Sequence, residues 1–340
     1  MKRFIGVDLH KKSFTVCYLT EAGERIIKSF GLRRIDDFIA TLFPEDELAV
    51  EACNNSLFFL GQVRRHVCVA HQIDPGQFKV IARSAKKTDE KDAELLALFL
   101  SKEMLPLARQ MDDRRARLKS LVGTRDRLVK ASTSLKNKVH NILSAQGLAV
   151  KAAELKSQAG LERIKEMARD DLTRLELQLL TDQIKSLEES VKKIEAELAK
   201  PDHQLPGHAS LVSIKGIGPV GAAVLSTVIG DIEDFADADH LASYFGLVPR
   251  VHQSADRQIY GRITKRGSKI GRTMLVQCTW IAIRYNPRLK AYYTKLRSKK
   301  NAGKAIIATA RKFLAVIYFT LKHQIIWENF PEGIIQSQAA

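Results

Sequence analysis

Short apolar strands alternate with helical stretches through the first hundred residues, and this order restricts the fold more than any other feature of the chain. Helical patterns occupy residues 33–42 and 56–66, and the second of these separates two strand patterns. The predicted strands, rich in β-branched and aromatic residues, are 3–9, 12–19, 24–30, 47–53 and 67–73. Three strands in hairpin order followed by a helix–strand–helix–strand series indicate a mixed sheet flanked by helices.

A helix beginning near Thr88 follows these strands, after a loop that contains Pro75 and Gly76. In "KKTDEKDAELLALFL", Asp89 and Asp92 stand three residues apart, so they share the helix face of the apolar residues that follow. The two carboxylates should therefore point towards a core. One explanation is local, because a Thr N-cap followed by acids in the first turn stabilises a helix. The other is a cation between the acids, since an unpaired buried charge is costly.

Two further acids stand near the ends of predicted strands. Asp8 lies at the end of the first strand, and Glu51 shares a face with Ala49 if its strand runs unbroken. Together with Asp89 and Asp92 they form an Asp…Glu…Asp-x-x-Asp series. Hard divalent cations take several oxygen ligands, and a pair of them can activate an attacking oxygen and stabilise a leaving one. The four acids therefore favour a Mg²⁺ site, which Mn²⁺ could also fill.

Two long helices are predicted after the sheet region. Residues 111–148 indicate a strongly basic helix with apolar residues along one side. Residues 177–198 place apolar residues at alternating spacings of three and four, which is the pattern of a coiled-coil seam. The seam consists of Leu177, Leu180, Ile184, Leu187, Val191, Ile194 and Leu198. It would pair either within the chain, with the helix at 111–148, or with another protomer.

Basic residues are concentrated in one part of the chain. The whole sequence has a formal net charge of +17, and residues 250–312 contain seventeen Lys and Arg but a single acid, Asp256. A basic field that concentrated usually faces a polyanion, with nucleic acid as the first candidate. A solvated basic surface is the alternative.

The remaining composition excludes several classes of protein. No apolar run approaches the ~18 residues of a membrane span, and the N-terminus lacks the pattern of a signal peptide. The four cysteines are scattered without a C-x-x-C pair, which predicts reduced thiols rather than a zinc site or a disulfide framework. We therefore expect a soluble, cytoplasmic protein that does not bind membranes.

A helix-hairpin-helix pattern stands at 211–232, in "LVSIKGIGPVGAAVLSTVIGDI". Two predicted helices flank a turn at Gly216 and Gly218, and Pro219 opens the second helix. Such glycines bring backbone N–H groups close to a helix N-terminus, which suits a phosphate. These glycines and the neighbouring Lys215 are therefore candidates for contact with a DNA backbone, and a plain tight helical turn is the alternative.

Several stretches resemble a known family. "FIGVDLHKKSF", "VEAC" and "KKTDEKDAELLALF" are similar to the RuvC-like (ribonuclease H-like) DEDD domain of insertion-sequence transposases of the 110/1111 family, related to the Piv DNA invertase. "IKGIGPVGAAVLSTVIGDIEDFADADHLASYFGLVPR" with "GRITKRG" resembles that family's C-terminal transposase domain. The resemblance implies metal ligands at Asp8, Glu51, Asp89 and Asp92, and a nucleophilic serine at Ser254.

The basic loop after "GLVPR" carries the implied nucleophile. Family members usually follow that serine with glycines, whereas Ala255 and Asp256 follow Ser254 here. Ser243 is therefore a second candidate, although "HLASYFG" indicates a helix in which Ser243 would be a packing residue. The residues around the loop that could contact nucleic acid are Arg257, Tyr260, Arg262, Lys265, Arg266, Lys269 and Arg272.

The resemblance implies an RNA-guided DNA recombinase of an insertion sequence. In this family a structured non-coding RNA, called a bridge or seek RNA, pairs with donor and target DNA. The RuvC-like domain of one protomer meets the serine domain of another, so we expect a homo-oligomer, from dimer to tetramer. The expected fold class is α/β plus α, with a RuvC-like domain at 1–105, a basic helix and coiled-coil region at 106–205, and a mainly helical transposase domain with the helix-hairpin-helix motif at 206–340.

Three other functions are compatible with parts of the sequence. A metal-dependent, structure-specific endonuclease of the Holliday-junction resolvase type would use the same four acids without a covalent serine intermediate. A sugar-kinase or actin-like ATPase shares the strand topology, but Leu9-His10-Lys11 lacks the Gly and the Thr or Ser of its first phosphate loop. A non-enzymatic DNA-binding protein would leave the four acids unexplained.

Overall fold

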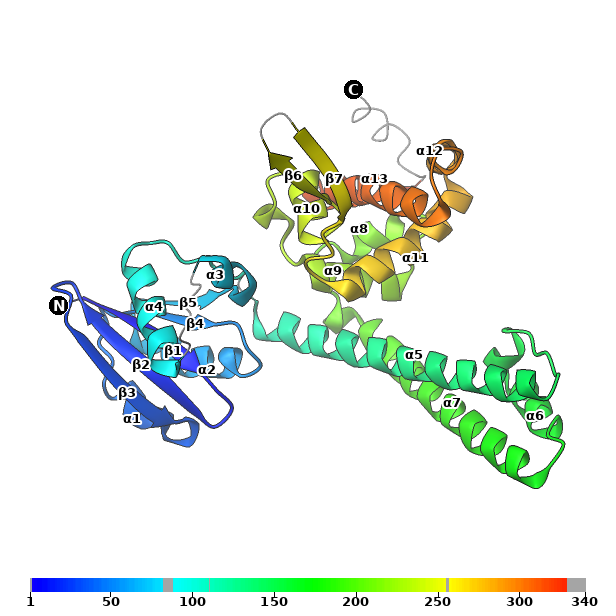
Figure 1. Ribbon diagram of the computed structural model, residues 1–340. Helices are drawn as coiled ribbons and strands as arrows, with labels where there is room; N and C mark the ends of the chain where they lie inside the picture. The colour runs from blue at the N-terminus through cyan, green and yellow to red at the C-terminus, as the bar shows by residue number, and fades with distance from the viewer. Residues whose placement is uncertain (1, 82–87, 110, 255–256, 329–340) are drawn as a thin grey trace. The chain divides into compact units, whose positions relative to one another are not determined.

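The computed structural model describes residues 2–81, 88–109, 111–254 and 257–328 of the 340-residue chain, with the backbone alone described at 79–81, 252–254 and 257–258. Contacts within the chain divide it into two units, Met1–Asp113 and Arg114–Ala340, whose elements are labelled in Figure 1. No helix in the described ranges is both long enough and apolar enough to cross a membrane.

The first unit is built on a five-stranded mixed sheet, which confirms the prediction. The strands are β1 (Arg3–Leu9), β2 (Ser13–Thr20), β3 (Arg25–Gly31), β4 (Glu47–Glu51) and β5 (Val69–Ile73). They lie in the order β3-β2-β1-β4-β5, in which β1 to β3 pair antiparallel, whereas β1, β4 and β5 pair parallel. The hairpin-connected strands thus form one side of the sheet and the strands joined through helices form the other.

One face of the sheet packs on α1 (Ile35–Ile39) and α2 (Ser56–Val63). Alternate residues of β1 and β4 point to this face, as strand geometry requires. The buried cluster that joins the sheet to the two helices includes Ile5, Val7, Leu48, Val50, Phe38 and Phe59. The first helix is shorter than the sequence pattern suggested, because residues 32–34 form a separate 3₁₀ turn ahead of it.

The opposite face of the sheet carries α4 (Asp89–Ser101), which Figure 1 shows lying across the strands. Ala49 of β4 packs in a buried cluster with Leu96 and Leu100 of this helix. The predicted N-cap is confirmed, because the Thr88 side chain accepts a hydrogen bond of 3.3 Å from the backbone N–H of Lys91.

A short helix, α3 (Pro75–Ile81), occupies a segment that we expected to be a loop. Pro75 stands at the first helical position, where its missing N–H costs nothing because that donor has no partner inside a helix. The Asp74 side chain then accepts a hydrogen bond of 2.7 Å from the backbone N–H of Gly76. Proline and glycine here mark a helix start rather than a loop, so the expectation was wrong.

Three helices open the second unit: α5 (Asp113–Ala145), α6 (Gln158–Glu166) and α7 (Asp171–Leu198). Figure 1 shows α5 and α7 running side by side. Leu177 and Ile184 of the predicted seam share a buried cluster with Val139 and Leu143 of α5. Ion pairs join the same helices, among them Arg125 to Glu195, Lys136 to Glu188 and Lys138 to Glu176. The apolar row on α7 therefore packs against α5 of the same chain.

The rest of the second unit is a helical bundle with one hairpin. Its elements are α8 (His208–Ser213), α9 (Pro219–Ile229), α10 (Ala238–Tyr244), β6 (Pro249–Ser254), β7 (Arg257–Ile263), α11 (Lys269–Tyr285), α12 (Pro287–Arg297) and α13 (Ala302–Lys322). Its fully buried core includes Leu225, Phe245, Leu275 and Phe313. The segment that we described as a basic loop is thus largely an antiparallel β-hairpin. The β-branched and aromatic residues Ile259, Tyr260 and Ile263 favour the second strand, although they do not alternate strictly with polar residues.

Candidate metal centre and nucleic-acid interface

Three elements of the first unit bring the four predicted acids to one edge of the sheet. Strands β1 and β4 are parallel neighbours with Val7 level with Val50, so Asp8 and Glu51 follow at the carboxyl ends of both strands. Strand alternation places these two acids on the face opposite Val7 and Val50, which is the face that α4 covers. Asp89 belongs to the first turn of α4, at the same edge.

Gly6 sets how closely α4 approaches β1. A Cβ atom on Gly6 would lie 2.1 Å from the carbonyl oxygen of Ala93 and 2.5 Å from the backbone nitrogen of Ala97. No side chain fits in that space, so the helix backbone rests directly on the strand. Because Asp8 lies two residues after Gly6 on the same face, this contact also determines the position of the start of α4 relative to Asp8.

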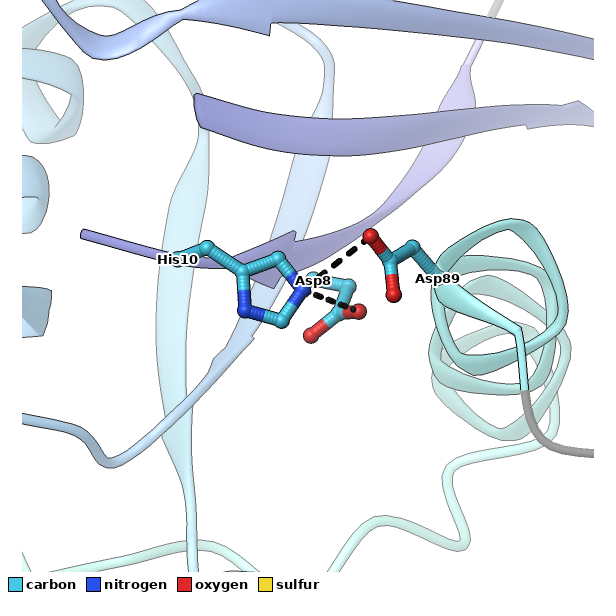
Figure 2. Close-up of side chains that lie close together, drawn as sticks. All are labelled: Asp8, His10 and Asp89. Atoms are coloured by element: carbon cyan, nitrogen blue, oxygen red, sulfur yellow. Dashed lines mark ion pairs between the residues drawn. The ribbon is translucent and has the colours of Figure 1, made fainter. Parts of the chain in front are cut away.

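Among the described residues, Asp8, His10 and Asp89 form a group of potential metal ligands whose ligand atoms all lie within 4.8 Å of one another. Figure 2 shows the His10 ring directed at both carboxylates. The Nε2 atom of His10 lies 3.2 Å from an oxygen of Asp8 and 3.2 Å from an oxygen of Asp89. Asp8 is the most buried of the three, with 16% of its side chain exposed, against 50% for His10 and 61% for Asp89.

Glu51 and Asp92 lie outside this group of three, although they share its edge of the sheet. Both are half-buried, and each interacts with another group of the protein. The structure therefore brings two of the four predicted ligands, Asp8 and Asp89, into direct proximity. The other two flank them on β4 and α4.

Sequence reasoning missed His10. It directly follows the strand that carries Asp8, and a histidine two residues from a candidate ligand was the available signal. The side-chain amide of Asn55 donates a hydrogen bond of 2.8 Å to the His10 carbonyl, and the His10 N–H donates one of 2.9 Å to the Ser13 carbonyl. The turn after β1 is thus anchored both to the turn after β4 and to the start of β2.

The donor set of this group fits a divalent cation. Ligand bonds of about 2.1 Å place neighbouring ligand atoms about 3 Å apart and opposite ones about 4.2 Å apart in an octahedral site. The distances from the His10 nitrogen to both carboxylate oxygens match the shorter spacing. Asp8, His10 and Asp89 could therefore hold one ion.

Ser254 is the last residue of β6, and its backbone pairs with Arg257 at the first position of β7. Ala255 and Asp256 lie outside the described residues, as do the side chains of Ser254 and Arg257. The alternative serine, Ser243, lies in α10 as expected, but its side chain is exposed. The expectation that Ser243 is a packing residue was therefore wrong.

The two glycines of the predicted helix-hairpin-helix motif lie in different environments, one packed and one exposed. Gly216 has φ +115°, and a Cβ on it would lie 2.7 Å from the backbone of Ala282 in α11, so its absent side chain permits this packing. Gly218 precedes α9 and is exposed, as is Lys215. In this motif, Lys215 and Gly218 face solvent, whereas the glycine at 216 is required for close packing against α11.

The basic residues in and after β7 also divide into two groups. Those with exposed side chains are Arg262, Lys265, Arg266 and Lys269, together with the aromatic Tyr260. Arg272 instead donates hydrogen bonds to the carbonyls of Phe245 (3.0 Å), Arg266 (3.1 Å) and Gly267 (3.3 Å). Partial burial lowers the pKa of Arg272 from its usual value. Arg272 thus holds the loop that carries Lys265 and Arg266.

Family models match most of the chain. The model DEDD_Tnp_IS110, described as "Transposase", matches residues 5–146, which include the edge of the sheet described above. A second model, "Transposase IS116/IS110/IS902 family", matches residues 208–294, from α8 to α12.

Individual relatives resemble the chain over nearly its whole length. A probable family 20 transposase from Pseudomonas aeruginosa is 26% identical and covers 94% of this chain and 97% of its own. The transposase for insertion sequence element IS1111A from Coxiella burnetii is 24% identical, with 95% and 90% covered, and the pilin gene-inverting protein of Moraxella lacunata is 26% identical, with 94% and 96% covered. The chain therefore belongs to the IS110/IS1111 family of insertion-sequence transposases.

Proposed function

We propose that this transposase cleaves and exchanges DNA strands in a Mg²⁺-dependent reaction that uses Ser254 as its nucleophile and a structured non-coding RNA as its guide. The observation that carries the metal-dependent part is the convergence of Asp8, His10 and Asp89, with Glu51 and Asp92 at the same edge of the sheet. Mn²⁺ is the other ion that we expect to support the reaction.

The acids and the serine would have separate tasks. A divalent cation held at this edge would supply positive charge that stabilises the attacking and departing oxygens of phosphoryl transfer. Asp8 and Asp89 would hold it, and Glu51 and Asp92 would complete its ligands or position bound water. The serine hydroxyl must lose its proton to become an effective nucleophile, and the basic surroundings of the hairpin favour the resulting alkoxide.

The proposed chemistry is a transesterification. The Ser254 oxygen would form a bond to the scissile phosphorus as the bond to one DNA strand end breaks, and the departing end would take up a proton as a free hydroxyl. The covalent phosphoserine ester conserves the energy of the broken bond, so a hydroxyl of another strand can later displace the serine. Rejoining then needs no external energy source.

The nucleic-acid partners are proposed to lie along the basic part of the second unit. Residues 257–327 contain no Asp or Glu. The exposed Arg262 lies in β7, the strand that pairs with the Ser254 strand, and the exposed Lys265, Arg266 and Lys269 follow β7. Contacts from the exposed Lys215 and Gly218, which precedes the N-terminus of α9, would add to phosphate binding. Donor DNA, target DNA and the guide RNA all present the phosphates that such a surface attracts.

A composite active site is part of the proposal. The acids belong to the first unit and Ser254 to the second, so we propose that they meet between protomers of a homo-oligomer, from dimer to tetramer. The apolar row at 177–198 contributes little to this assembly, because it faces α5 of the same chain. The name of the Moraxella relative, a pilin gene-inverting protein, supports rearrangement of DNA by cleavage and rejoining.

The test is a search for the covalent intermediate. Protein incubated with labelled substrate DNA, the guide RNA and Mg²⁺ should give a shifted band on a denaturing gel, and the band should vanish in Ser254→Ala and in Asp8→Ala. Ser243→Ala is the matched control and should keep the adduct. An adduct in Ser254→Ala would move the nucleophile elsewhere, with Ser243 as the next candidate. Normal cleavage without any adduct would favour the resolvase-type endonuclease.

A further inference from the structure

One ring nitrogen of His10 faces two carboxylates, and a single hydrogen bond can satisfy only one of them. Its Nε2 atom lies equally far, 3.2 Å, from an oxygen of Asp8 and from an oxygen of Asp89 (Figure 2). One ring nitrogen carries at most one hydrogen, so a straight hydrogen bond can reach only one of these oxygens. A cation placed among the three atoms would interact favourably with all of them.

The backbone of His10 is held on both sides of the residue. The His10 N–H donates to the Ser13 carbonyl at 2.9 Å, and its own carbonyl accepts from the Asn55 side chain at 2.8 Å. Leu9, the residue before it, is buried in the core of the sheet. Because the backbone is already fixed, no backbone entropy is lost when the ring binds a ligand, and only the side-chain rotamers have to be ordered.

We propose that His10 is a ligand of the metal centre through Nε2, and that this nitrogen makes the site prefer Mn²⁺ over Mg²⁺. The inference rests on the proposed function, because it concerns the ion held by Asp8 and Asp89. Mg²⁺ favours oxygen ligands, whereas imidazole nitrogen suits first-row transition metals. A site with two carboxylates and one imidazole therefore gains more affinity for Mn²⁺ than a site of carboxylates alone.

Electron spin resonance of bound Mn²⁺ tests the ligand directly, without an activity assay. The full-length protein with one equivalent of Mn²⁺ should show electron spin-echo modulation from a directly bound imidazole nitrogen. His10→Ala should lose the modulation. His66→Ala is the matched control, since His66 lies in the 3₁₀ turn after α2 and outside the group of three. Its spectrum should equal that of the unmodified protein.

Calorimetric titration measures the selectivity. In His10→Ala the ratio of Mn²⁺ to Mg²⁺ affinity should fall at least about tenfold, mostly through weaker Mn²⁺ binding. His10→Gln replaces the ring nitrogen by an amide oxygen. Relative to the unmodified protein, it should lose less affinity for Mg²⁺ than for Mn²⁺. Circular dichroism melting of each variant checks that the fold is retained.

The outcomes separate this inference from the proposed function. Bound Mn²⁺ that depends on Asp8 but shows no nitrogen modulation would overturn the role of His10 and leave the metal centre in place. An unchanged selectivity ratio in His10→Ala would do the same. Full-length protein that binds no Mn²⁺ at the site, with Asp8→Asn indistinguishable from the unmodified chain, would overturn both.

Discussion

A single methyl group on Gly6 should impair DNA cleavage far more than it impairs folding. In Gly6→Ala the new Cβ would begin 2.1 Å from the Ala93 carbonyl oxygen and 2.5 Å from the Ala97 nitrogen. Both are backbone atoms of α4, so no side-chain rotation relieves the overlap. Real Cβ atoms come no closer than about 3 Å to such neighbours, so the helix must withdraw from β1 by about 1 Å.

The size of both effects follows from that displacement. Overpacking a core contact costs about 1–3 kcal/mol, and a loss of about 2 kcal/mol lowers the melting temperature of a unit of this size by about 8–16 °C. The same movement carries Asp89 away from Asp8 and His10. A misplacement of about 1 Å at a reacting centre can reduce the rate by about a hundredfold.

Two measurements on the full-length protein check this prediction. Thermal melting followed by circular dichroism gives the loss of stability, and single-turnover cleavage of labelled substrate DNA with saturating Mg²⁺ gives the rate. Hydrogen exchange followed by mass spectrometry should show faster exchange in peptides from β1 and α4, and unchanged exchange in α13. Gly61→Ala is the control, because nothing lies within 4 Å of its Cβ position in α2, and it should be neutral or stabilising by about 0.4–1 kcal/mol.

Normal melting and normal cleavage by Gly6→Ala would refute the reasoning. That result would mean that α4 does not rest on β1 at Gly6, or that the spacing of the acids does not govern the reaction. A variant that is destabilised as expected but cleaves at the normal rate below its melting temperature would refute the second step alone.

Three further predictions concern the second unit. Arg115 is buried and donates hydrogen bonds to the carbonyls of Thr227 (3.0 Å) and Val228 (3.1 Å). Arg115→Met should lower the free energy of unfolding by about 3 kcal/mol in denaturant unfolding, because both carbonyls lose a charged donor. An unchanged midpoint would refute this. The double variant Leu187→Asp, Ile194→Asp should lower the melting temperature and leave the mass of the folded species unchanged in light scattering, because the apolar row of α7 packs on α5. A smaller folded species would instead show that this row joins protomers. Nucleic-acid affinity should fall steeply with salt, and removing one exposed cation such as Arg262 should reduce the salt slope by about one if it contacts a phosphate; a binding constant that is flat between low and moderate salt would count against the interface.

Most of the secondary structure could be predicted because it is a local property. The strand at Arg3–Leu9 and the cap at Thr88 follow from alternation and from side-chain chemistry within a few neighbouring residues. The same alternation placed Glu51 on the face of Ala49, because a strand turns its side chains to opposite sides by geometry alone. Local patterns failed at Pro75, where proline and glycine are compatible with both a loop and a helix start.

The sequence by itself determined which residue types could hold a cation, namely carboxylates at the ends of elements that bury their apolar faces. Only the tertiary structure decided which of them meet, because residues 8 and 89 approach through the packing of α4 on β1, and that packing depends on the missing side chain of Gly6. The same holds for His10, which approaches Asp89 of α4, and for Arg272, which donates to the carbonyl of Phe245, 27 residues earlier in the chain. A pattern along one segment contains no information about the distance to another segment, and that distance is set by how the two pack.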